Sequence, residues 1–534
     1  MGPFGGGIYS GMSHRTIRTL LQLGVVAVVV VALPYKMFEL DRYFVPKELV
    51  LHIVALLIAT LLVRRRAANV DIADWLLALF LVWSAASALF ATNYWLAQRA
   101  LGLSVSSAVI FWGARSLGRS GSYRPLLIAA AIAAVCASLA AMAQAYGVET
   151  ELFSMNRSPG GTLGNRNFVA HIAAIGLPAM VWCTLTARRS AGALFGSIGA
   201  AILVAALVLS RSRGAWLAMV ATVIVLAGPM LAPRKYWSGG KIGGRLARLL
   251  LAGVLGAILV VVLPNSLNWN SDSPYLDSAR GVMDYKKGSG SGRIAQYRNS
   301  LRMAVANPVF GVGPGNWPVT YVRFAPSSDR SIADDGMTAN PWPSSDWMAF
   351  VAERGFIPSL ALLGTFAVLF LGAFRGWRRL EDGDAVLAKL TLGGTIVATM
   401  VVGAFDVSLL LAAPAFLVWT ILGATSGVGS RGRDVALSRG YWALATAAAM
   451  LVMVASTVRS ATQTRAMATV GRGGHTAGWV ESAGWDPGSY RINLRVAELY
   501  AARGRCTTAS KYARRAGGLF PNAPGPKQIA RSCD

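Results

Sequence analysis

Long apolar stretches recur along the chain, and short polar segments separate them. A helix that crosses a bilayer needs about 20 mostly apolar residues. The stretches are continuous rather than alternating, which favours helices over the strands of a membrane barrel. The pattern predicts thirteen spans, over residues 16–34, 48–63, 75–91, 100–114, 125–146, 168–186, 192–210, 215–232, 247–263, 355–374, 387–405, 408–426 and 440–457. We expect the first span to be retained, because no small-residue cleavage site follows its long apolar run.

The composition excludes a soluble enzyme. The chain has 534 residues, of which 54% are hydrophobic and 14% charged, whereas soluble domains carry about 25% charged residues. We therefore predict an all-α polytopic membrane protein with about 12–13 transmembrane helices. The net charge of +27 is attributed to cytoplasmic loops, where Lys and Arg accumulate, and no nucleic-acid partner is expected. Four cysteines are too few for a disulfide scaffold.

The basic residues of the short loops give the orientation. With the N-terminus in the cytoplasm, 21 Lys and Arg residues fall in inner loops and 8 in short outer loops, as the positive-inside rule requires. The orientation depends on residues 387–426, which hold two predicted spans around Asp406. A single span there would reverse everything that follows.

Two long segments then lie outside. Residues 1–458 are predicted to form the membrane domain, with an outer loop over 264–354, and residues 459–534 form a tail. Small and aromatic residues recur at helical spacing in the tail, which indicates one or two tetratricopeptide-like hairpins and a surface for an envelope protein partner. Cys506 and Cys533 both lie there and could pair in an oxidising compartment.

Two motifs place polar side chains beside the sixth and seventh spans. "GGTLGNRNFVAH", residues 160–171, contains Asn165, Arg166 and Asn167, which can cap a helix or contact a substrate. "SRSRGAW", residues 210–216, places Arg211 and Arg213 near membrane depth, where an arginine costs at least about 2.5–3.5 kcal/mol. Either lipid phosphate or a bound phosphorylated lipid would compensate.

The outer loop contributes "SGRIAQYRNSLRMAVANPVFGVGPGNW", residues 291–317. Its apolar positions recur at helical spacing. Arg293 stands at the predicted helix start, as a solvated end or as a ligand of an anion, and Arg298 lies beyond it. The glycine-rich end follows no strand and precedes no Gly-Lys-Ser/Thr, so nucleotide binding is not supported.

Three side chains are candidates for acid–base chemistry. Asp346 and Glu353 lie seven residues apart, on one face of a predicted helix, and could pair with the arginines or act as a base. His171 follows Asn167 by four residues, on the same helix face, as a packed interfacial residue or a base. No cluster of His, Cys and carboxylates predicts a metal site.

The chain resembles the O-antigen ligase/polymerase superfamily of bacterial envelope glycosyltransferases. The resemblance covers about residues 160–365 and the many-span layout. It is carried, in chain order, by "GTLGNRN", "SRSRGAW", "R…NPVFGVGPGNW" and "SSDWMAFVAERGFIP".

The resemblance implies a GT-C-like membrane enzyme that needs neither cofactor, nucleotide nor metal. Such an enzyme takes a glycan from undecaprenyl diphosphate at the periplasmic face of the bacterial inner membrane and passes it to a glycan, lipid or protein acceptor hydroxyl. Its active face and the tail would be periplasmic. The residues implied for the diphosphate are Arg211, Arg213 and Arg293. Those implied for substrate contacts are Asn165, Arg166, Asn167, Arg298 and Ser344.

One position departs from the family. Ligases of this superfamily carry a histidine where alignment on Glu353 places Ser344, and serine is not a base near neutral pH. Asp346, Glu353 and His171 are the candidate replacements, and the departure favours a polymerase over a ligase slightly. Two other classes stay open: a transporter of a lipid-linked glycan, which should show broken helices and internal symmetry, and a non-catalytic homologue that scaffolds an envelope complex.

Overall fold

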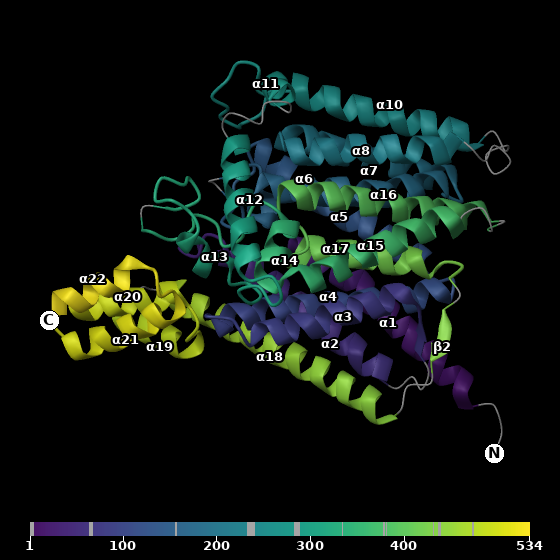
Figure 1. Cartoon of the computed structure of the whole chain (residues 1–534). Helices are drawn as coiled ribbons and strands as arrows, with labels where there is room; N and C mark the ends of the chain where they lie inside the picture. The colour runs from purple at the N-terminus through teal and green to yellow at the C-terminus, as the bar shows by residue number, and fades with distance from the viewer. Residues whose placement is uncertain are drawn as a thin grey trace.

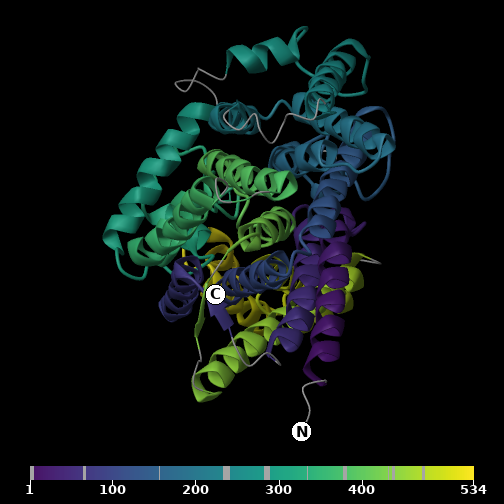
Figure 2. The ribbon, with the colours of Figure 1, turned by 90° about the vertical axis from the view of Figure 1, so that its right-hand side faces the viewer.

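The structure is a computed structural model that describes residues 5–63, 68–154, 157–231, 241–281, 289–333, 335–376, 380, 382–430, 432–435, 439–471 and 475–533. Each of the thirteen predicted spans coincides with one helix of the bundle in Figures 1 and 2. These helices are α1 (Gly5–Val30), α2 (Asp41–Val63), α3 (Ile72–Ala88), α4 (Tyr94–Arg119), α5 (Arg124–Ala145), α6 (Arg166–Leu185), α7 (Ser190–Ser210), α8 (Arg213–Leu231), α10 (Lys241–Val262), α15 (Phe356–Gly376), α16 (Gly383–Phe405), α17 (Ala412–Gly427) and α18 (Arg439–Gly471).

The helices have the lengths and composition of a polytopic membrane protein. Within the described residues, nine helices are long and apolar enough to cross a membrane, and α3, α8 and α17 are shorter apolar helices. The predicted all-α membrane class is thereby confirmed. Several basic residues that the predicted orientation rests on lie outside the described residues, namely Arg64, Arg65, Arg66, Arg234, Lys235, Arg378, Arg379 and Arg431.

Burial separates central helices from peripheral ones. In α6 and α16, 83% of the apolar window is buried inside the protein, against 17% in α10 and 22% in α18. A helix that is apolar all round and little covered by protein has its apolar surface available to lipid. The helices α10 and α18 therefore form the flanks of the bundle, which Figure 1 shows at opposite edges.

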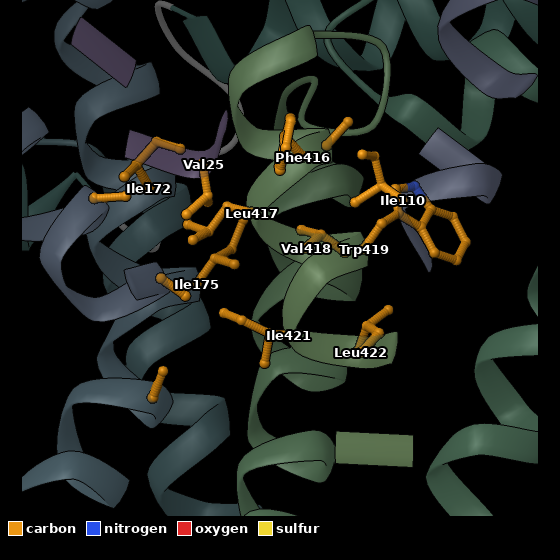
Figure 3. Packing of buried hydrophobic residues seen from close by; sticks show 14 of the residues in the cluster. Val25, Ile110, Ile172, Ile175, Phe416, Leu417, Val418, Trp419, Ile421 and Leu422 are labelled. Carbon is orange, nitrogen blue, oxygen red and sulfur yellow. The ribbon is translucent and has the colours of Figure 1, made fainter. Parts of the chain in front are cut away.

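The helix α17 forms the centre of the bundle, and every one of its residues is buried. Figure 3 shows Leu417 and Ile421 packed toward Ile172 and Ile175 of α6. On the side toward α4, a Cβ at Gly423 would lie 2.4 Å from a backbone carbonyl oxygen of that helix. Small residues allow such close helix packing inside membranes, and α17 thereby fixes α4 and α6 around one core.

Residues 406–411 form a non-helical segment between α16 and α17. Two helices rather than one therefore occupy residues 383–427, as the predicted orientation requires.

A small antiparallel pairing of β1 (Ala68–Val70) with β2 (Arg433–Val435) joins the loops before α3 and after α17. Figure 1 shows β2 at the end of the bundle opposite α12.

The long loop carries short helices of its own: α11 (Pro274–Arg280), α12 (Ser289–Ala306), α13 (Trp317–Thr320), η2 (Tyr321–Arg323) and α14 (Asp346–Arg354). Figure 1 shows them at the same end of the bundle as the tail, and we call this end the loop face. The predicted helix of the loop begins earlier than expected, at Ser289, and ends before Asn307–Pro308 as predicted.

The tail consists of α19 (Thr476–Trp485), α20 (Tyr490–Ala501), α21 (Cys506–Leu519) and α22 (Pro524–Cys533). The preceding helix α18 continues to Gly471, past the boundary that the sequence predicts at residue 458. The Asn522 side chain donates to the Val319 carbonyl at 3.2 Å, so the tail lies against the long loop. Cys506 and Cys533 form a disulfide across α21 and α22.

We expect the tail thiols to react with a membrane-impermeant maleimide in intact spheroplasts only after reduction, because the disulfide blocks both sulfurs. Labelling is measured by mass shift. A Cys506→Ser/Cys533→Ser double variant is the control and should stay unlabelled, since Cys136 and Cys183 lie within spans. Labelling that requires permeabilised membranes would place the tail in the cytoplasm.

Candidate functional site on the loop face

The site is organised by the first turn of α6. Asn165 is the N-cap residue, and its side chain accepts a hydrogen bond from the Asn167 backbone N–H at 3.0 Å. Gly164 has a φ of 79°, and a Cβ there would lie 2.4 Å from the Tyr43 ring, so the turn needs glycine. The buried Lys47 ammonium donates to the Thr162 carbonyl at 2.9 Å. Asn165 thus caps the helix.

One turn further along α6, Asn167 and His171 meet the carboxylate of Asp406. The Asn167 side-chain amide donates to Oδ2 of Asp406 at 3.1 Å, and Nε2 of His171 lies 3.9 Å from the same oxygen. The Asp406 side chain is 15% exposed, whereas that of His171 is 2% exposed. Of these two titratable groups, the carboxylate is therefore the one that a substrate can reach.

The helix α12 places a cation and a phenol beside this carboxylate. Burial raises the pKa of Tyr297 to about 12, the nearby Arg293 guanidinium lowers it, and the Asp406 carboxylate raises it. Tyr297 therefore stays protonated at neutral pH, and its hydroxyl donates to the Ser344 carbonyl at 2.9 Å. Arg293 also acts electrostatically on His171. Arg293, Tyr297, His171 and Asp406 consequently form one polar cluster.

Two further arginines flank a tryptophan of the long loop. The Arg166 and Arg211 guanidinium carbons lie 5.0 Å and 4.6 Å from the centre of the Trp269 ring. Nε of Arg211 donates to the Ser278 hydroxyl at 2.8 Å. Burial lowers the pKa of Arg211, and the Asp277 carboxylate opposes this effect, yet a guanidinium remains charged at neutral pH. The pair concentrates positive charge at the start of α6.

Arg211 also has an unusual backbone. Its φ is 55°, and among the described residues it is the one non-glycine residue with a positive φ. Such a conformation costs about 1–2 kcal/mol for a residue with a side chain. Strained backbone of this kind is concentrated at functional sites. Here it ends α7 and turns the Arg211 side chain onto Trp269.

The sequence matches a known family over this part of the chain. Residues 198–363 fit the family model described as O-antigen ligase. This match supports the resemblance of the chain to the O-antigen ligase/polymerase superfamily. No curated protein matches it. The matched segment runs from α7 to α15 and includes Arg211, Arg213 and Arg293, whereas the α6 turn and Asp406 lie outside it.

Within the matched segment, the Asp346 carboxylate is enclosed by hydrogen-bond donors. It is 0% exposed. Its Oδ2 accepts from the Ser408 N–H, the Ser408 hydroxyl and the Leu409 N–H at 2.7–3.0 Å, and its Oδ1 accepts from the Leu410 N–H at 3.3 Å. Burial raises its pKa to about 6 despite these donors. Asp346 thus fixes α14 to the turn that carries Asp406.

Glu353 is closed off in the same way at the other end of α14. Its oxygens accept from the Gly315 N–H at 2.8 Å and the Trp317 N–H at 3.3 Å. Burial raises its pKa, and the adjacent Arg354 guanidinium lowers it. Glu353 therefore holds the "GVGPGNW" loop, which explains this loop without a phosphate ligand.

The remaining predicted residues lie around the cluster. The Arg213 guanidinium donates to the Gly281 carbonyl, so it faces the segment after α11. The Ser344 N–H donates to the Gln296 side chain at 2.6 Å, so its backbone joins the loop to α12. Arg298 is exposed on α12. The structure thus brings Arg166, Asn167, His171 and Arg293 to Asp406 or Trp269 and leaves Arg298 apart.

Asp346→Ala should destabilise the protein. Four buried donor groups would lose their acceptor, and each unsatisfied buried group costs about 1–3 kcal/mol. We expect the free energy of unfolding to fall by at least about 3 kcal/mol, measured as earlier thermal loss of monodisperse protein in detergent. The exposed Asp272→Ala is the control and should change stability by under about 0.5 kcal/mol. Equal stability of the two variants would contradict this role.

The sequence pattern did not identify Asp406 as a site residue, although a signal was present. Asp406 is the one charged residue between positions 390 and 430. An ionisable side chain in so apolar a stretch is costly and is commonly functional.

As for metals, the described residues contain no group of three or more His, Cys, Asp or Glu side chains that could hold an ion.

Proposed function

We propose that the protein transfers or polymerises a glycan from an undecaprenyl-diphosphate carrier onto an acceptor hydroxyl. The match of residues 198–363 to the O-antigen ligase family model supports this reaction type. The observation that carries the proposal is the Asp406 carboxylate, which contacts Asn167 and His171 and shares with Arg293 an electrostatic influence on Tyr297. A base and fixed cations stand together there, as transfer from a diphosphate requires.

Asp406 is the proposed base. It takes the proton of the acceptor hydroxyl as that oxygen bonds to the anomeric carbon. The bond between the anomeric carbon and the diphosphate oxygen breaks in the same transfer, and undecaprenyl diphosphate leaves with the bonding electrons. The more exposed position of Asp406 favours it over His171, which we assign as a positioning residue. Asp346 and Glu353 have their oxygens occupied by donors.

Arg293 and Arg211 are proposed to stabilise the leaving diphosphate, with Arg166 beside them. Negative charge grows on the leaving group during transfer, and fixed cations stabilise the transition state most at that point. A guanidinium can bind two phosphate oxygens at once. Arg213 supports this group from the start of α8. The polar side chains of Asn167 and Arg298 remain proposed contacts of the sugar.

The proposed setting is the periplasmic face of the bacterial inner membrane. The long loop and the tail share the loop face, and the positive-inside rule places this face outside. The acceptor would be a glycan, a lipid or a protein, and the helical tail would contact an envelope partner. The GT-C-like description of the bundle and the tetratricopeptide-like description of the tail belong to this proposal.

A transfer assay tests the function. Purified protein is incubated with undecaprenyl-diphosphate oligosaccharide and acceptor glycan, without nucleotide and with EDTA. We expect longer glycans to form at the same rate as with added Mg²⁺, because the proposed chemistry uses arginines rather than a metal. Activity that appears only with Mg²⁺ or nucleotide would contradict the proposed mechanism.

A further inference from the structure

A cavity on the loop face lies apart from the Asp406 cluster. It measures about 490 Å³, and its walls come from the α3–α4 loop, the end of α12 and η2. The helix α14 lies between the Asp406 cluster and the cavity. At its first residue, Asp346 contacts the turn after Asp406, and Gly355, directly after its last residue, packs on Val309 of the cavity wall. Nine residues of helix span about 13 Å, so the cavity is not the reacting centre.

The apolar wall of the cavity is an aromatic stack. The Phe310 ring lies 4.6 Å from the Phe90 ring and 5.5 Å from the Trp83 ring, centre to centre, in stacked orientation. Phe90 is nevertheless 58% exposed. Phe324 also lines the cavity. Such a wall binds apolar or amphipathic groups.

The polar part of the cavity carries a single charge. Arg323 is the one charged residue among those that line it, with Asn307, Thr92 and Thr320 as neutral polar neighbours. No salt bridge to Arg323 occurs within the described part of the chain. An unpaired guanidinium between neutral hydrogen-bonding groups selects an anion, and a phosphate suits its geometry best.

The cavity lies beside the end of α3, because the Trp83 indole of α3 donates to the carbonyl of Val309, which lines the cavity, at 2.9 Å. Exposed apolar residues follow one side of α3 and continue to Leu89 and Phe90. The stripe of α3 comprises Ile72, Trp75, Leu79 and Val82. An acyl chain along this stripe would bring a headgroup phosphate to Arg323.

We propose that this cavity binds an anionic lipid of the adjoining leaflet, with its phosphate on Arg323 and one acyl chain along α3. Neither the cavity nor its ligand is needed for the transfer chemistry proposed above. The binding measurement below therefore stands whether or not the protein transfers glycans.

The test is native mass spectrometry of the delipidated full-length protein, titrated with phosphatidylglycerol or with zwitterionic phosphatidylcholine. Arg323→Gln should weaken phosphatidylglycerol binding about tenfold, since it removes the charge-assisted hydrogen bond to the phosphate. It should weaken phosphatidylcholine binding less, because the choline cation offsets the charge of that phosphate. The exposed Arg330→Gln, in the same loop, is the control and should bind like wild type. Phe90→Ala should weaken both lipids.

Two results would overturn the proposal. Equal phosphatidylglycerol affinity in the Arg323→Gln, Arg330→Gln and wild-type proteins would show that the lipid binds elsewhere. Displacement of phosphatidylglycerol by equimolar inorganic phosphate would show that the cavity selects a free anion rather than a lipid.

Discussion

Replacement of Asp406 by Asn is expected to reduce glycan transfer by about 10²–10⁴-fold, the usual contribution of a general base, with no loss of folded protein. The amide keeps the size of the side chain and can still accept the hydrogen bond from Asn167, which the carboxylate receives at 3.1 Å. It cannot take a proton from the acceptor hydroxyl. The rate of glycan elongation is measured with purified protein at saturating donor.

Asp382→Asn is the matched control for this variant. Asp382 caps the opposite end of the same helix, α16, and accepts from the Asp384 N–H, a role that Asn fills equally well. This control should keep wild-type activity. An Asp406→Asn protein that retains more than half of the activity would exclude Asp406 as the base.

His171→Gln separates the base from its positioning residue. Glutamine keeps a polar group near Oδ2 of Asp406, which the imidazole approaches to 3.9 Å. If His171 acts through Asp406, this variant should retain part of the activity with a shifted pH profile. If His171→Gln instead loses as much activity as Asp406→Asn, and the pH profile of the residual activity is unchanged, the proton transfer would be assigned to His171.

Replacement of Arg293 by Ala is expected to lower transfer by about 10²–10³-fold, the cost of removing one preorganised group that stabilises transition-state charge. Arg293 lies close enough to Tyr297 to lower the pKa of its hydroxyl, and the leaving diphosphate is proposed to gain charge beside this guanidinium. The effect should fall mainly on kcat rather than KM, because the stabilisation grows in the transition state. Arg293→Lys should restore part of the rate by supplying a point charge.

Arg302→Ala is the control for the loss of one cation from α12. Arg302 is exposed on the same helix and lies outside the cluster. Its loss tests whether net charge on the loop face alone accounts for the effect. Equal losses in the Arg293→Ala and Arg302→Ala proteins would indicate general attraction of the anionic donor rather than a diphosphate site.

The fold followed from the sequence because each span is a local property. A run of apolar residues predicts a helix without knowledge of its neighbours, and all thirteen predicted spans coincide with helices. The two apolar runs in 387–426 were recognised for the same reason, and the structure has two helices there, α16 and α17. The extension of α18 to Gly471 was missed, since polar residues outside the bilayer can continue a helix without an apolar signal.

The site was harder to predict, because its contacts join distant residues. Asn167 and Asp406 are 239 positions apart, and no local pattern pairs them. For Asp346 and Glu353, the sequence placed two carboxylates on one helix face correctly. The sequence could not show that backbone N–H groups donate to both carboxylates and enclose them. Whether a carboxylate faces a substrate or a ring of donors depends on loop conformation.

The arginines illustrate the same limit. From the sequence, Arg211 was notable because an arginine near membrane depth is unfavourable. The structure places its guanidinium, like that of Arg166, on the Trp269 ring. The tryptophan between them, Trp269, lies in a loop segment with no regular pattern. Its role as their common partner could emerge only from the folded chain.

The most direct test of the central proposal is the stoichiometry of a single-turnover reaction. Purified protein is mixed with undecaprenyl-diphosphate oligosaccharide and acceptor, and both released undecaprenyl diphosphate and new glycosidic bonds are counted. The wild-type protein should release one undecaprenyl diphosphate for each glycosidic bond formed. The Asp406→Asn protein should bind the donor but release no undecaprenyl diphosphate. The contrary result would be a donor that binds to the wild-type protein but is never cleaved, with the Asp406→Asn protein behaving identically. It would show that the protein carries a lipid-linked glycan rather than transferring that glycan.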